Sequence, residues 1–195
     1  MLNRQSARSL ARYRLWADQL TYETVASLPP GEAAKERPTP LKSIIGTLNH
    51  IYLVDLIWRA HLEGRDHGFK SRHVMLHEDP SELWEAQQAV DRWYVDWSDR
   101  QSERMLDDIV RFRFIDGKAG AMSRGAILLH VVNHATYHRG WIAEMLFKVP
   151  APNPTTDLPV YFRTLSPSHQ ETFHDQPIPL RSRAAGRFHG HHASR

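Results

Sequence analysis

The spacing of apolar residues constrains the fold of this chain more than any other feature. In four long segments, apolar residues recur mostly at intervals of three and four, which places them on one face of an α-helix. Pro29-Pro30-Gly31 follows the first segment and Pro150 follows the last. The pattern predicts four long amphipathic helices and an all-α four-helix bundle. The predicted helices cover residues 6–28, 41–64, 80 to 102 or 105, and 123–149.

Sequence signals at the helix ends support this interpretation. Asp79-Pro80 is a typical helix start, because proline fits the first turn and an acidic side chain is favoured there. Ser123 is a typical N-cap for the last long helix. Between these two helices, Val110 and Phe112 alternate with charged residues and Asp116-Gly117 indicates a turn. The region 109–122 is therefore predicted to be a short extended hairpin or crossover.

The chain is predicted to divide into one domain and a tail. At this length a single domain, residues 1–165, can bury a hydrophobic core, with residues 157–165 as one short docking segment. Residues 166–195 are rich in Pro, Ser, Arg and His and contain few apolar residues. Such a composition does not offset the entropy of ordering, so we expect a flexible Arg/His-rich C-terminal tail.

The net charge of +3 gives little support for nucleic-acid binding. The tail holds four Arg and two acidic residues, which leaves 21 basic and 20 acidic side chains in residues 1–165. A DNA-binding domain usually gathers Lys and Arg on one face. Nothing in the sequence indicates such a face, and we expect no nucleic-acid partner.

The absence of cysteine narrows the chemistry. Without cysteine the chain forms no disulfide, thiolate nucleophile or cysteine-ligated metal site, so a tightly bound metal needs His and carboxylate ligands. No segment has the apolar length of a signal peptide or a transmembrane helix. We expect a soluble, cytoplasmic protein without a membrane partner.

Three of the 13 histidines have the arrangement of metal ligands. His134 and His138 are four residues apart, so on a helix their imidazoles project from the same face about one turn apart. His50 lies in the most apolar predicted helix, and helical bundles build metal sites from inward-facing side chains of neighbouring helices. We therefore predict a divalent metal site at His50, His134 and His138, with a coordination position open for water or substrate. Three imidazoles suit zinc, nickel, iron or copper.

Other residues near this motif leave alternatives open. His130 lies one turn before His134, and the rotation of a helix by about 40° over four residues favours a non-ligand over a fourth ligand or a hydrogen-bond partner. Arg139 is expected to pair with a carboxylate such as Glu144 or Asp55, and binding of an acidic substrate is the alternative. Four histidines between 61 and 77 are expected on the solvated surface. The tryptophans are expected mainly in the core, and a substrate cleft lined by one of them is the alternative for Trp16, Trp58 or Trp141.

Several short stretches, in order along the chain, form a combined pattern. They are Tyr13 with Trp16-Ala17-Asp18, then Ser43-Ile-Ile-Gly-Thr-Leu-Asn-His50-Ile51, then Leu128-Leu-His-Val-Val-Asn-His134-Ala-Thr-Tyr-His138-Arg-Gly140, and finally Pro152 and Asp157-Leu158. Together they resemble the DinB/YfiT-like superfamily of metal-binding four-helix bundle proteins over about residues 5–163. The resemblance implies that His50, His134 and His138 are the metal ligands. Many relatives have His-His-Arg-Gly-Gln where this chain has Tyr137-His-Arg-Gly-Trp141, which changes the shape of the expected pocket.

The residues and the resemblance together lead to two functional hypotheses. The first is a metal-dependent enzyme of the thiol-dependent transferase or hydrolase type, with a zinc, nickel or iron ion, a small-molecule substrate and a small thiol as cosubstrate. No general acid or base is evident in the sequence. The second is a non-catalytic, stress-related bundle whose metal site is structural and which acts as a dimeric binding module. A homodimer is expected in either case, because six tryptophans exceed what a small core easily buries.

Overall fold

The computed structural model describes residues 2–149 and 151–165. Within these residues the chain forms six helices and one two-stranded sheet, so the expected predominance of helix is confirmed. In chain order the elements are α1 (Arg4–Ala26), α2 (Ile44–Leu62), α3 (Pro80–Asp99), α4 (Glu103–Asp107), β1 (Ile109–Arg113), β2 (Ala119–Ser123), α5 (Arg124–Leu146) and α6 (Leu158–Leu165).

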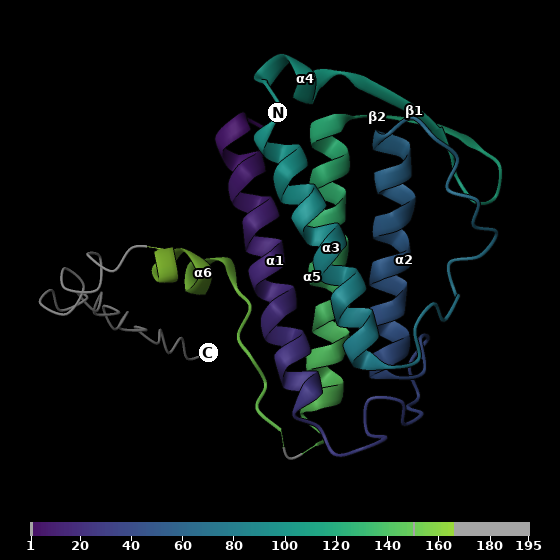
Figure 1. Ribbon diagram of the computed structural model, residues 1–195, viewed down its shortest axis with the longest axis vertical. Coiled ribbons are helices and arrows are strands. Elements are labelled where there is room, and N and C mark those ends of the chain that lie inside the picture. Colours follow the sequence, from purple (N-terminus) through teal and green to yellow (C-terminus); the bar gives the residue numbers. More distant parts are fainter. Residues whose placement is uncertain (1, 150, 166–195) are drawn as a thin grey trace, which may run out of the picture. The chain divides into compact units, whose positions relative to one another are not determined.

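The four long helices lie side by side (Figure 1). The most extensive contacts pair α1 with α3 and α5, and α2 with the same two helices. Helix α2 is buried along most of its length, as its wide apolar face predicts, and the core between the helices includes Leu48, Leu83, Ile127 and Ile142. Among the described helices, none is both long enough and apolar enough to cross a membrane.

Side-chain caps define where the long helices begin. The Ser123 hydroxyl accepts a hydrogen bond from the Ala126 amide at 3.2 Å, which confirms its predicted role. Asp79 accepts from the Ser81 amide at 2.7 Å, with Pro80 in the first turn. Ser43 caps α2, so that helix begins at Ile44 rather than at residue 41.

The third predicted helix is shorter than expected. It ends at Asp99 instead of residue 102 or 105, and a separate short helix, α4, follows. The Gln101 side-chain amide donates to the Trp97 carbonyl at 2.8 Å, and the Ser102 hydroxyl accepts from the Met105 amide at 3.2 Å. These side chains provide hydrogen-bond partners for backbone groups at the end of one helix and at the start of the next, so one helix stops and another begins here.

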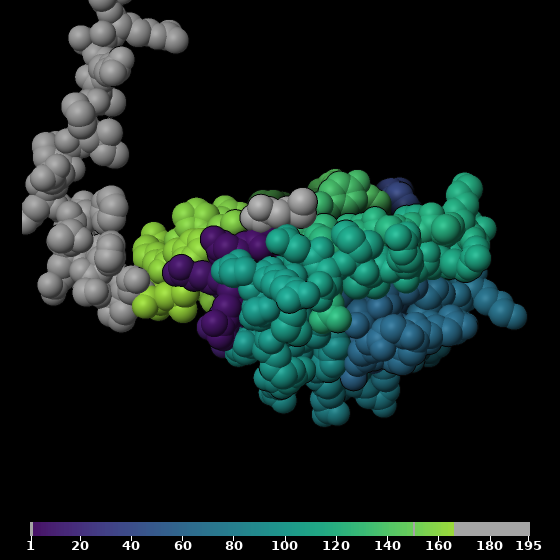
Figure 2. All heavy atoms as spheres, turned by 90° about the horizontal axis from the view of Figure 1, so that it is seen from above, coloured from purple at the N-terminus to yellow at the C-terminus, as the bar shows by residue number. Residues whose placement is uncertain are grey.

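The extended segment before α5 is a hairpin rather than a crossover. Strands β1 and β2 pair antiparallel, with Phe112 opposite Gly120, and the turn contains Gly117 at φ 83°. The Phe112 ring packs against Trp58 of α2 at a centroid distance of 4.9 Å. In Figure 2 the teal and green residues of the hairpin adjoin the blue residues of α2 and of the segment that follows it. The hairpin thus packs on α2 beside the site described below.

The segment expected to dock after the last long helix contains helix α6. Its Tyr161 is buried, and the Tyr161 ring lies 5.7 Å from Tyr13 and 5.4 Å from Trp16 of α1. Residues up to Tyr161 belong to one compact unit. The predicted flexible tail, residues 166–195, lies outside the described residues, so the domain boundary at 165 stays a prediction.

Candidate metal centre

Three histidines from two neighbouring helices meet in the interior. His50 comes from the middle of α2, and His134 and His138 come from successive turns of α5. Helices α2 and α5 are packed against each other, which brings residues 84 positions apart in sequence into contact. The structure therefore brings together the three residues that the sequence predicts as ligands.

The nitrogen atoms of the three rings have a spacing that one ion can bridge. His50 Nε2 lies 3.2 Å from His134 Nε2, and one ligand nitrogen from each ring lies within 4.8 Å of the others. Metal–nitrogen bonds of about 2.0–2.1 Å at tetrahedral angles place neighbouring nitrogens about 3.4 Å apart. The spacing between His50 and His134 is close to that value.

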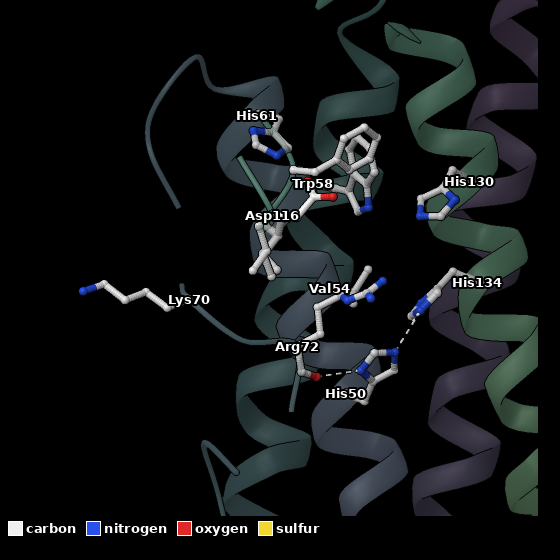
Figure 3. Close-up of a pocket in the computed structure, with 12 residues that line it drawn as sticks. His50, Val54, Trp58, His61, Lys70, Arg72, Asp116, His130 and His134 are labelled. Atoms are coloured by element: carbon white, nitrogen blue, oxygen red, sulfur yellow. Dashed lines mark hydrogen bonds between the residues drawn. The ribbon is translucent and has the colours of Figure 1, made fainter. Parts of the chain in front are cut away.

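A backbone contact fixes the orientation of His50. The Nδ1 atom of His50 lies 2.8 Å from the carbonyl oxygen of Arg72, and because a carbonyl only accepts, Nδ1 carries the proton and donates (Figure 3). In the neutral ring the lone pair is then on Nε2, the nitrogen that faces His134. This is the arrangement that commonly orients a metal-binding histidine.

A buried amide holds in place the loop that carries Arg72. Asn49, next to His50, accepts hydrogen bonds from the backbone amides of Leu76 at 2.8 Å and His77 at 3.0 Å, and donates to the His77 carbonyl at 2.8 Å. Its side chain is buried in the most apolar helix. This role was not predicted from the sequence, although an asparagine within the most apolar predicted helix, next to a predicted ligand, is visible there.

The environment keeps all three rings neutral. Burial lowers the pKa of His134 to about 2 and that of His138 to about 4, and nearby histidines add to both shifts. Burial also lowers the pKa of His50. Neutral imidazoles are the form that binds metal, so at neutral pH protons do not compete for these nitrogens.

The donor set fits a divalent ion. Among the described residues, the Nδ1 atoms of both His134 and His138 are buried without a hydrogen-bond partner. An ion bound at these atoms would give each of them the partner that a buried polar atom normally has. A cluster of neutral nitrogens with unused hydrogen-bonding capacity suits zinc, nickel or iron.

A cavity of about 560 Å³ opens beside the histidines (Figure 3). Its volume falls in the range of small-molecule sites, about 300–1,000 Å³. The walls come from α2, α5, the loop after α2 and the turn of the hairpin. They include His50 and His134 at the metal centre, apolar residues of α2 and charged residues of the loops.

The exposure of the other histidines differs in part from the prediction. His130 lies outside the cluster of three and packs edge-on against Trp58 at 4.9 Å, and both residues line the cavity. His73 is exposed, as expected. The remaining three of the stretch, His61, His67 and His77, are half-buried and thus less solvated than expected, and His61 also lines the cavity. Of the three tryptophans considered for a cleft, Trp58 lines this one.

Arg139 pairs with a carboxylate, but with a different one from those proposed. Its guanidinium donates to Asp18 Oδ1 of α1 at 2.8 Å and to the Thr136 hydroxyl at 2.9 Å. Glu144 instead pairs with Lys148. Because Arg139 is 4% exposed, it ties α5 to α1 and is not available to a substrate.

A larger buried ionic cluster was not predicted from the sequence. Arg14 of α1 contacts Asp55 of α2, and its Nη2 atom lies 3.1 Å from Asp91 of α3 and 3.4 Å from Asp18. Burial raises the pKa of Asp55 to about 6 despite the opposing effect of Arg14. The signal was present, since Asp55 interrupts the most apolar helix, but only packing reveals its partner.

Comparison with known proteins agrees with this architecture and motif. The family model described as "DinB family" matches residues 1–171. Protein DinB of Bacillus subtilis (strain 168) is 28% identical over 159 residues, which cover 78% of this chain and 91% of that protein. The resemblance found in the short motifs therefore extends over the whole described region, and the chain belongs to the DinB family.

Proposed function

We propose that this protein is a metal-dependent enzyme that holds a divalent ion through His50, His134 and His138 and acts on a small molecule. The observation that carries the proposal is a cluster of three neutral imidazoles, two of which, His50 and His134, line a cavity of about 560 Å³. A structural metal site is usually closed by four protein ligands. Here the described residues offer three, and the cavity gives a ligand access to the remaining positions.

The geometry of the site indicates the role of each residue. A bound zinc, nickel or iron ion supplies Lewis acidity, which lowers the pKa of a water or thiol bound to it. His50, oriented by the Arg72 carbonyl, and the two histidines of α5 hold the ion at the cavity wall. Trp58 and the neighbouring apolar residues of α2 exclude water from that side of the cavity. We assign the reaction class as thiol-dependent transfer or hydrolysis, with a small thiol as cosubstrate in the first case.

Two further features complete the proposal. The four long helices form a closed four-helix bundle around the metal centre, as their pairwise contacts suggest. The protein forms a homodimer in the cytoplasm. Leu129 and Tyr137, which are 50% and 59% exposed on α5, support the dimer because they lie two turns apart on one helix face. A purely monomeric species in light scattering would rule out the dimer.

Metal analysis of the purified protein tests the site. We expect about one equivalent of divalent metal per chain, and loss of that equivalent in His50→Ala, His134→Ala and His138→Ala. His73→Ala is the matched control, because His73 is exposed and its ring lies 5.9 Å from His50 without joining the cluster. Full metal content in His134→Ala would contradict the assignment.

A second experiment separates the enzyme from the non-catalytic alternative. Metal-loaded protein is incubated with a panel of electrophiles, each with and without a small thiol, and with ester and amide substrates. Turnover that is lost in His134→Ala supports catalysis. A metal that neither exchanges its water nor supports any turnover would instead favour a structural role, in which the ion only ties α2 to α5.

A further inference from the structure

Arg72 approaches the candidate site with two different groups. Its backbone carbonyl accepts the hydrogen bond from His50 Nδ1 at 2.8 Å. Its side chain extends from the same loop into the cavity, and Figure 3 shows the guanidinium directed past Val54 toward the side on which His130 and His134 lie. One residue therefore both orients a candidate ligand and places a cation beside it.

No acid forms a direct ion pair with this guanidinium among the described residues, although the pKa of Asp116, lowered mainly by Lys118, is lowered further at longer range by its charge. Nor does any hydrogen bond within the described part of the chain engage the Arg72 side chain. The one acidic residue in the cavity lining, Asp116, pairs with Lys118 at 2.9 Å. The other cation, Lys70, contributes to the rim, but its ammonium group points away from the histidines (Figure 3). Arg72, an exposed residue of the loop, is thus the cation of this lining whose side chain is directed toward the histidines and makes no direct ion pair.

Part of the cavity wall is apolar. Trp58 is 7% exposed and packs with Phe112, so its ring is held in one orientation. Ile57 and Val54 of α2 and Phe114 of the hairpin continue this surface. A ligand beside the histidines therefore meets an apolar surface around Trp58 and the guanidinium of Arg72.

We propose that Arg72 is a specificity-determining residue that binds the carboxylate of a small acid whose apolar or aromatic part packs against Trp58. The planar guanidinium matches a carboxylate in a two-point contact, and one cation balances its single charge. A phosphate ester carries nearly two charges and is usually held by more donors than this lining offers. That Arg72 thereby selects the substrate of the metal centre rests on the function proposed above.

Benzoate is a suitable probe, because it combines one carboxylate with one aromatic ring. We would titrate zinc-loaded, 15N-labelled protein with benzoate, with neutral benzyl alcohol and with inorganic phosphate, and follow the indole N–H resonance of Trp58. We expect saturable shifts with benzoate, and weaker binding of both other probes. Arg72→Gln should weaken benzoate binding by roughly tenfold or more, as expected for loss of a charge-assisted contact, while Arg72→Lys retains part of it.

The controls separate this inference from a general effect of charge. Arg72→Gln keeps the backbone carbonyl that orients His50, so its zinc content should stay at the wild-type level. Lys70→Gln removes an equal charge from the same loop and should leave the affinity for benzoate within about twofold, because its ammonium points outward. Equal losses in the two variants, unchanged affinity in Arg72→Gln, or no saturable binding by the wild type would overturn the role of Arg72.

The same titration of metal-free protein distinguishes the two proposals. Benzoate binding that depends on Arg72 in a chain that takes up no zinc would refute the metal centre and retain the anion site. Binding that requires zinc and is insensitive to Arg72→Gln would show direct coordination of the carboxylate, and would refute the anion site alone. Tighter binding of phosphate than of benzoate would refute the assignment to a carboxylic acid.

Discussion

Replacement of Arg14 by methionine should destabilise the protein strongly. Arg14 is 1% exposed and contacts Asp18, Asp55 and Asp91, which come from three different helices. Methionine fills a similar volume but leaves the carboxylates without this cation. Asp18 keeps Arg139 as a partner, whereas Asp55 and Asp91 keep only the side-chain amide of Gln87, at 3.0 and 2.9 Å.

The magnitude follows from burial. Because the side chains of Asp55 and Asp91 are 0% exposed, water does not replace the lost partner. Removing one member of a buried ion pair costs about 3–5 kcal/mol, a large part of the total stability of a domain. Burial already raises the pKa of Asp55 to about 6 with Arg14 present. Without Arg14 both carboxyls should take up protons more readily, so the penalty should shrink between pH 7.5 and pH 5.5.

Urea denaturation followed by circular dichroism at both pH values measures this effect. Arg12→Met is the matched control, because Arg12 lies on the same helix and its ion pair with Asp99 is 44% and 37% exposed. Its cost should stay below about 1 kcal/mol at either pH. Arg14→Lys, which keeps the charge, should fall between the two and serves if Arg14→Met does not fold. A loss in Arg14→Met no larger than that in Arg12→Met would refute the reasoning.

Three further predictions concern the backbone and the metal centre. Gly46→Ala should destabilise the protein by about 1–3 kcal/mol, because a Cβ at this position meets the Leu41 carbonyl oxygen. Gly140→Ala should be neutral or stabilising by up to about 1 kcal/mol, because the space around Gly140 is open. Thermal melts of the two variants distinguish these outcomes. Burial lowers the pKa of His134 to about 2 and that of His138 to about 4, so below pH 6.5 the unfolded metal-free chain binds protons that the folded protein does not. The free energy of unfolding should therefore fall on acidification, by at most about 1.4 kcal/mol per pH unit for each histidine. The fall should be less steep in His134→Leu. Urea titrations at pH 7.5, 6.5 and 5.5 measure this difference. Zinc at 100 times its dissociation constant should stabilise the wild type by about 2.7 kcal/mol and His134→Ala hardly at all, and an equal increase in both would contradict the site.

Features that depend on nearby residues were predictable from the sequence. The long helices follow from apolar spacing, and the Ser123 cap and the Asp116-Gly117 turn follow from residue types that suit those positions. His134 and His138 share a helix face because four residues make about one turn. These relations hold whatever the rest of the chain does, so they carry over into the folded protein.

The predictions are wrong where contacts of particular side chains decide where a helix ends or which charged residues pair. Apolar spacing continues past Asp99, but Gln101 and Ser102 provide hydrogen bonds that end one helix and begin another. The sequence favours an acid such as Glu144 or Asp55 as the partner of Arg139, whereas the structure places Asp18 of α1 beside it. Pairing across helices depends on their rotation and relative height, which the spacing of one helix does not specify.

The sequence by itself determined the family, the long helices and the three histidines, because each rests on local periodicity or on a short motif. Only the tertiary structure decided that Arg14 lies among three carboxylates and that the Arg72 carbonyl accepts a hydrogen bond from His50. It also decided that a cavity lies beside the histidines. The physical reason is that a backbone carbonyl has no signature in residue identity, and a cavity is the space left by elements distant in sequence. Their positions are fixed by the packing of all the helices together.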